Sequence, residues 1–175
     1  MDRKAARDIA RKLESLDPSP LVPLRARDAA LDREIEALAS ARAPEIHRAL
    51  RSALHLWNDN LPAAHELAQE IPDETGSYLH GLMHRREPDY ENSKYWFRRV
   101  GRHPLFPDVR REALEALSGR PDLRQGIDVA PEWDPFRMVD WCREAARKPE
   151  LEAVLRAVQA RELALLAGFC LSRIE

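Results

Sequence analysis

The chain has 175 residues and a hydrophobic content of 44%, enough for one domain with a buried core or for two small helical units that share one. Asp and Glu number 30 against 28 Lys and Arg, and the net charge is -2. This balance gives no electrostatic reason to expect a nucleic acid or an anionic membrane as partner.

The two cysteines, Cys142 and Cys170, lie far apart in helical patterns, which favours buried reduced thiols over a disulfide-stapled secreted scaffold. The first residues are charged throughout and lack the apolar core of a signal peptide. No apolar run approaches the roughly 18 residues that a membrane-spanning helix needs. The sequence therefore predicts a cytoplasmic protein.

The 13 prolines fall mostly between periodic segments, which is typical of short helices separated by linkers. The first two predicted helices, 2–16 and 25–41, are highly charged and flank a Pro-rich linker over residues 17–24. Their charge predicts a solvated face or, as a second choice, the contact surface of a homodimer.

Four better organised helices are predicted in the central third, with apolar residues at i, i+3, i+4 and i+7, over residues 45–57, 62–71, 77–86 and 90–100. The first pair matches the second at an offset of 29 residues. Leu50 then falls on Leu79, and His55 falls on His84. A fixed period of apolar positions is typical of stacked helical hairpins.

The second of these hairpins resembles a tetratricopeptide repeat. Gly81 and Ser93 stand 12 residues apart, like the small residues that let the two helices of that repeat touch. The sequence departs from the repeat at His80 and Ser77, where Leu and Trp are usual. The resemblance implies repeat-like hairpin packing inside a compact domain, over roughly residues 45–104.

Beyond the centre, helices are predicted over 107–117, from Asp134-Pro135 onward and over 150–174, and residues 118–133 are expected to form a Gly/Pro loop. The long last helix is the expected strut of the C-terminal half. The fold prediction is one all-α domain over residues 1–175, an array of antiparallel helical hairpins. It has charged N-terminal helices (1–43), a tetratricopeptide-like centre (44–104) and a C-terminal helical cap (105–175).

Reactive residue types concentrate in residues 78–104. Three His, several Arg, carboxylates, an amide and aromatic residues gather there, whereas packing alone is better served by Leu and Ala. Side chains at i, i+4 and i+7 share one face of a helix, so two polar faces of the antiparallel hairpin are expected to converge on a pocket. The residues of these two faces are His80, His84 and Glu87 on the first helix and Asn92, Trp96, Arg99 and His103 on the second.

The chain resembles a family of uncharacterised bacterial and fungal proteins over the string from His80 to Pro104, which reads His-Gly-x-x-His-Arg-Arg-Glu-x-Asp-Tyr-x-Asn-x-Lys-Tyr-Trp-Phe-Arg-Arg-Val-Gly-x-His-Pro. Residues 57–59 and the segment around His65 fit the same family. The resemblance covers about the middle third of the chain and implies no particular reaction.

A metal-binding site is one interpretation of residues 78–104. His80 and His84 stand at i and i+4, as two helical histidines do in HExxH metalloproteases, and Glu87, His103 or a residue outside the hairpin would be the third ligand. No HExxH is present, however, and the alternative is a pair of core histidines bonded to their neighbours. No metal is therefore assigned, and one at His80 and His84 stays an open alternative.

A metal-free polar site is the second reading. A carboxylate or phosphate is a suitable ligand because Arg binds both in bidentate fashion. His84 and Glu87 form the candidate catalytic acid–base pair. The candidate ligand-binding residues are His80, Arg85, Arg86, Asn92, Trp96, Arg99 and His103. The alternative is an Arg–carboxylate network that only fixes the hairpin.

The leading function is therefore the binding of a small anionic ligand in this pocket, with catalysis left open. The second is a tetratricopeptide-type interaction scaffold whose concave surface binds a peptide, and the third is a metal-dependent hydrolase. A nucleic-acid surface is disfavoured because Trp96 and Phe97 occupy core-stripe positions. His65 and residues 57–60 are expected to be structural.

Overall fold

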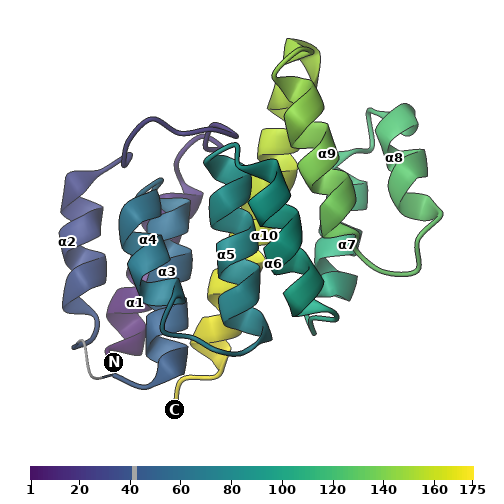
Figure 1. Ribbon diagram of the computed structural model, residues 1–175. Helices are drawn as coiled ribbons and strands as arrows, with labels where there is room; N and C mark the ends of the chain where they lie inside the picture. The colour runs from purple at the N-terminus through teal and green to yellow at the C-terminus, as the bar shows by residue number, and fades with distance from the viewer. Residues whose placement is uncertain (41–42) are drawn as a thin grey trace.

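The computed structural model describes residues 1–40 and 43–175, and every regular element within them is an α-helix. The ten helices of these residues are α1 (Arg3–Glu14), α2 (Ala29–Ala37), α3 (Glu45–Trp57), α4 (Leu61–Ala68), α5 (Glu74–Arg86), α6 (Tyr90–Val100), α7 (Phe106–Ala116), α8 (Pro121–Asp128), α9 (Pro135–Ala145) and α10 (Pro149–Ser172). Figure 1 shows α3 to α6 side by side in the centre. The predicted all-α class of helical hairpins is confirmed.

Acidic caps set where the N-terminal helices begin. The carboxylates of Asp2 and Asp28 each accept hydrogen bonds from two backbone N–H groups of the first turn of α1 and α2. Asp28 therefore holds the start of the second helix at Ala29, later than the predicted residue 25. The predicted end of this helix, at residue 41, lies outside the described residues.

The central helices keep the predicted offset. Helices α3 and α5 begin at Glu45 and Glu74 and end at Trp57 and Arg86, so both boundaries differ by 29 residues. Helix α5 starts earlier than the predicted residue 77 because the Asp73 carboxylate accepts a hydrogen bond from the first turn at 2.9 Å.

One serine joins the two helices of each hairpin. Ser52 of α3 donates to the carbonyl of Ala64 in α4 at 2.8 Å, and Ser93 of α6 donates to the carbonyl of Gly81 in α5 at 2.7 Å. Ser52 and Gly81 are 29 residues apart, as are Ala64 and Ser93. The same crossing is therefore bridged in both hairpins, from opposite helices, and the close contact predicted from Gly81 and Ser93 is present.

Gly81→Ala is expected to destabilise the fold by about 1 to 3 kcal/mol. A Cβ there would lie 2.7 to 2.9 Å from the ring of Phe97, which is buried and has little room to retreat. Gly168→Ala in α10 is the matched control, because nothing lies within 4 Å of its added Cβ. There the better helix propensity of Ala should stabilise by roughly 0.5 to 1 kcal/mol. Urea unfolding measures both, and equal effects would contradict the close approach of α5 to α6.

The C-terminal third contains a helix that the sequence analysis missed. Helix α8 occupies part of the segment predicted as a Gly/Pro loop, with Leu123 and Ile127 buried at i and i+4. That prediction was wrong because Pro121 stands in the first turn, where proline suits a helix, and Gly126 lies inside the helix beside Trp141. Cβ at Gly126 would lie 3.2 Å from the Trp141 ring, so the glycine allows close packing.

Both cysteines are buried and free, as the sequence indicated. Burial raises the pKa of the Cys142 thiol to about 11 and that of the Cys170 thiol to about 12. Both sulfurs are therefore protonated at neutral pH and unsuited to nucleophilic chemistry.

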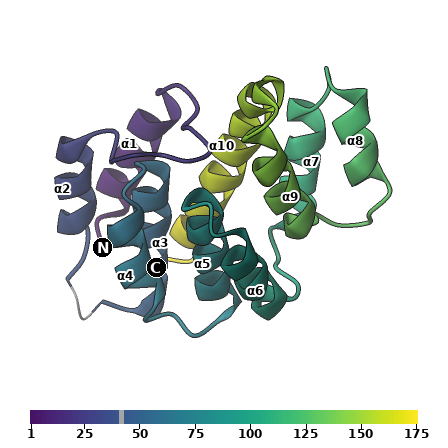
Figure 2. The same cartoon turned by 45° about the horizontal axis from the view of Figure 1, so that its top comes forward.

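Helix α10 contacts helices from both ends of the chain. It packs against α1, α3, α7 and α9, and Figure 2 shows it passing between the N-terminal helices and α7 to α9. It also bonds to α5: Glu162 accepts a hydrogen bond from the Tyr78 hydroxyl at 2.8 Å and pairs with Arg85 at 2.7 Å. The predicted strut of the C-terminal half thus extends to the central hairpins. In the described part of the chain, every helix is too short or too polar to span a lipid bilayer.

Candidate functional site

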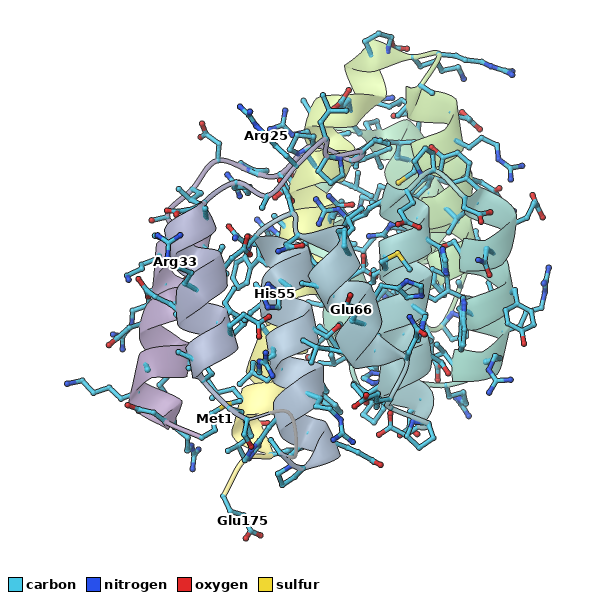
Figure 3. The ribbon with its side chains drawn as sticks, turned by 60° about the vertical axis from the view of Figure 1, so that its left-hand side comes forward. Met1, Arg25, Arg33, His55, Glu66 and Glu175 are labelled. Carbon is cyan, nitrogen blue, oxygen red and sulfur yellow. The ribbon has the colours of Figure 1, made fainter. Side chains whose placement is uncertain are left out.

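An open groove of about 500 Å³ lies between α4, α5 and α6. Figure 3 labels Glu66 on the outer surface of α4, the helix that forms one wall. Five of the predicted site residues line the groove, together with six others: His80, His84, Asn92, Trp96 and Arg99, with His65, Gln69, Ile71, Pro72, Ser77 and Tyr95. The predicted convergence of the two polar faces is therefore present for these five.

His80 and Arg99 both lie against Trp96. The His80 ring stacks on the indole with centroids 4.0 Å apart and planes 15° apart, and the Arg99 guanidinium lies 5.3 Å from the indole centroid. Nδ1 of His80 donates to the carbonyl of Gly76 at 2.9 Å, because a carbonyl can only accept, and Nε2 therefore carries the lone pair. Trp96 thus fixes the orientation of a cation and an imidazole at one end of the groove.

His84 is held by a carboxylate and an amide. Its Nδ1 lies 3.3 Å from the Glu87 carboxylate, and its Nε2 lies 3.1 Å from the Asn92 side-chain nitrogen. With the proton on Nδ1, the ring can donate to this carboxylate, and Nε2 can then accept from the amide. The predicted contact between His84 and Glu87 is therefore formed.

Burial lowers the pKa of both His80 and His84 below the ordinary value of 6.5. The neighbouring His65 lowers both pKa values further, whereas the Glu87 carboxylate partly opposes the shift at His84. Both imidazoles are accordingly neutral at pH 7, which suits hydrogen bonding or metal ligation better than charge pairing.

His65 completes the histidine cluster and was missed as a site residue. Its ring centroid lies 5.3 Å from that of His80 and 5.6 Å from that of His84. Its place beside a core stripe indicated a structural role, but the side chain is half-buried and lines the groove. No local signal in the sequence marks it, because His65 lies outside the stretch 78–104 in which the polar residues concentrate.

Arg85 and Arg86 do not reach the groove, and their prediction as ligand-binding residues is corrected. Both are fully buried in the core. Arg85 pairs with Glu162 of α10, and Arg86 pairs with Asp59 and donates to the carbonyl of Leu56. A charged side chain at such a place needs a buried partner, which these contacts supply, so neither guanidinium is available to a ligand.

His103 also lies away from the groove. It is buried, its Nε2 lies 3.3 Å from the Thr75 hydroxyl, and its Nδ1 accepts from the backbone N–H of Leu105 at 3.2 Å. Its ring packs edge-on against Tyr78 at 5.0 Å. Burial lowers its pKa to about 4. The predicted ligand-binding role is replaced by a structural one.

Glu87 does not line the groove but lines a second hollow of about 740 Å³. That hollow lies between the Pro-rich linker and the two hairpin turns and shares no lining residue with the groove. Its buried charges, Asp59 and Arg86, already pair with each other. These two buried charges are therefore not available to a ligand in the larger hollow.

The equivalent histidine of the first hairpin, His55, has a different environment. It is labelled in Figure 3 on α3, and its ring lies 3.2 Å from Asp32 and 2.9 Å from Glu36, both in α2. Asp32 also accepts from Asn58 at 2.8 Å, which explains the structural role expected for the turn at residues 57–60. Helix α2 thus places carboxylates beside His55, whereas α4 places His65 beside His84.

Within residues 1–40 and 43–175, no three His, Cys, Asp or Glu side chains gather their ligating atoms closely enough to hold a metal ion as they stand. Comparison of the chain with protein-family models, with curated proteins and with solved structures finds no match to any of them. The resemblance to bacterial and fungal proteins over His80 to Pro104 therefore stays a prediction, and the geometry of the groove carries the functional argument.

Proposed function

We propose that the groove between α4, α5 and α6 binds a small anionic ligand. The observation that carries this proposal is the position of Arg99. Its side chain is exposed, lines the groove beside Trp96, and within the described residues has no carboxylate at ion-pair distance. A guanidinium held in this way is suited to a carboxylate or phosphate, which it can bind with two parallel hydrogen bonds.

The polar side chains beside Arg99 supply neutral hydrogen bonds to the same ligand. The Asn92 amide and the His84 ring lie on one wall, and His65 lies on the other. Because Arg99 is the one permanent charge among the groove residues, a ligand with one or two negative charges suits the site better than a polyanion.

Catalysis at His84 is a proposal that rests on its contact with Glu87. The carboxylate, 3.3 Å from Nδ1, orients the ring and leaves Nε2 as the basic atom. That atom now accepts from Asn92, so a substrate would have to displace the amide before His84 could take a proton from it.

The interaction-scaffold alternative has less support. It requires an open concave surface, whereas α10 packs along α3 and bonds to α5 through Tyr78 and Arg85. The chain's own last helix therefore covers the face that a peptide would use. The cytoplasmic location and, as a second choice, a homodimer remain proposals from the sequence.

Arg99→Ala is expected to weaken the binding of inorganic phosphate about tenfold or more, since hydrogen bonds to a charged group are worth roughly 1.5 to 3 kcal/mol. Isothermal titration calorimetry with a metal chelator present measures the affinity. The matched control is Arg98→Ala, which removes the same charge from the adjacent exposed position, outside the groove.

Both variants should keep the melting temperature of the wild type, because neither side chain is buried. Equal affinities for phosphate in the Arg99 and Arg98 variants would show that net charge alone governs binding. That result would contradict the proposed groove site.

A further inference from the structure

His65, His80 and His84 bring three imidazoles from two helices to one place. Their ring centroids are 5.3, 5.6 and 6.3 Å apart. Three imidazoles that bind one tetrahedral ion through nitrogens at about 2.0 to 2.1 Å have ring centroids roughly 5 Å apart. The cluster therefore has nearly the separations of a three-histidine metal site.

In two of these rings, the hydrogen bond at Nδ1 leaves Nε2 available to bind a metal ion. His80 donates Nδ1–H to the Gly76 carbonyl, and His84 directs Nδ1–H to the Glu87 carboxylate. Metal-binding histidines almost always donate their second N–H to a carbonyl or carboxylate in this way, which fixes the tautomer and makes the other nitrogen more basic. Nε2 is thus the potential ligand in both rings.

The pair α2 and α3 shows that a side chain on the first helix can contact both of the corresponding positions on the second. At the offset of 29 residues, Glu36, Arg51 and His55 correspond to His65, His80 and His84. The Glu36 carboxylate bonds to the Arg51 guanidinium and lies 2.9 Å from Nε2 of His55. Helices α2 and α3 thus join their three side chains through opposite charges, whereas α4 and α5 place three imidazoles at the corresponding positions.

We propose that His65, His80 and His84 bind one divalent transition-metal ion of the zinc class, with a fourth coordination position open to the groove. Imidazole suits zinc, and three protein ligands with one open position are the pattern of sites that take an exogenous ligand. Metal binding would require the His65 ring to turn about its side-chain torsions and the Asn92 amide to leave Nε2 of His84. The metal site does not depend on anion binding at Arg99, although a bound ion would add positive charge beside it.

The test is calorimetric titration of chelator-treated protein with Zn²⁺ in buffer without phosphate. The wild type is expected to bind one ion per chain. His65→Ala should weaken that binding by more than roughly a hundredfold, beyond the loss typical of residues behind the ligands. His47→Ala is the matched control, since His47 is also half-buried, lies on α3 and does not line the groove.

A second variant, His65→Cys, replaces the imidazole by a thiolate. It should retain Zn²⁺ binding, and its Co²⁺ complex should gain a sulfur-to-metal charge-transfer band in the near ultraviolet that the wild type lacks. Failure of the wild type to bind Zn²⁺, or equal Zn²⁺ binding by wild type and His65→Ala, would overturn the proposal. Since phosphate binding is measured with chelator present, either proposal can fail without the other.

Discussion

Glu162→Leu is expected to destabilise the protein by about 3 to 5 kcal/mol, the cost of removing one partner of a buried ion pair. Glu162 and Arg85 are both fully buried, and their side chains meet at 2.7 Å. The Tyr78 hydroxyl donates to the second carboxylate oxygen at 2.8 Å. Leucine would leave a buried guanidinium and a buried hydroxyl without their acceptor, and urea unfolding would measure the loss.

The environment of Arg85 makes the loss of stability in Glu162→Leu larger than the loss on breaking an ordinary ion pair. Within the described residues, the Nε and Nη1 atoms of Arg85 have no hydrogen-bond partner, so Glu162 is the one acceptor that its guanidinium has. The double variant Arg85→Met with Glu162→Leu is the control. It removes both charges together and should be distinctly more stable than Glu162→Leu alone. If the double variant is instead the less stable of the two, the destabilisation of Glu162→Leu does not come from an unpaired charge.

Acid is expected to destabilise the protein through His103 as the pH falls from 6.5 towards 4. The pKa of His103 is lowered to about 4 in the folded protein, from an ordinary value of 6.5, chiefly by burial. Protonation of Nδ1 would also turn a second N–H towards the backbone N–H of Leu105 that it now accepts from. The unfolded chain therefore takes up the proton first, and stability is lost across this window by on the order of 2 to 3 kcal/mol.

The variant His103→Gln isolates this contribution. Its amide oxygen can accept from Leu105 and its nitrogen can donate to Thr75, but the side chain does not titrate. Urea unfolding at a series of pH values should give a flatter slope for the variant than for the wild type between pH 6.5 and 4. Parallel slopes for the two proteins would mean that His103 titrates as it does in the unfolded chain.

The parts of the fold that follow local signals could be predicted closely. Helices α3 and α6 begin and end at the predicted residues because residues at their ends mark them, such as Pro44 before α3 and Asp89 before α6. Helix α8 was missed because its apolar residues are few and Gly126 suggested a loop. What stabilises that helix is burial of Leu123 and Ile127, which the composition of the segment alone does not report.

The predicted convergence of the candidate site residues is present only in part, for a similar reason. Local spacing placed His80, His84 and Arg99 on converging faces, and the structure brings them to one groove. The same spacing could not separate Arg99 from Arg85, because the partner of Arg85 lies 77 residues away on α10. Residue type is the same in both cases, and only tertiary packing decides which guanidinium is buried.

The central claim is that the residues lining the groove bind the anion and that the buried predicted residues do not. Titration with phosphate followed by NMR, with chelator present, tests this claim most directly. The account predicts saturable shifts with one dissociation constant at the Trp96 indole, the Asn92 amide and the Arg99 guanidinium, and unchanged signals from the buried His103. Shifts centred on His103, or on the hollow beside the Pro-rich linker, would contradict it.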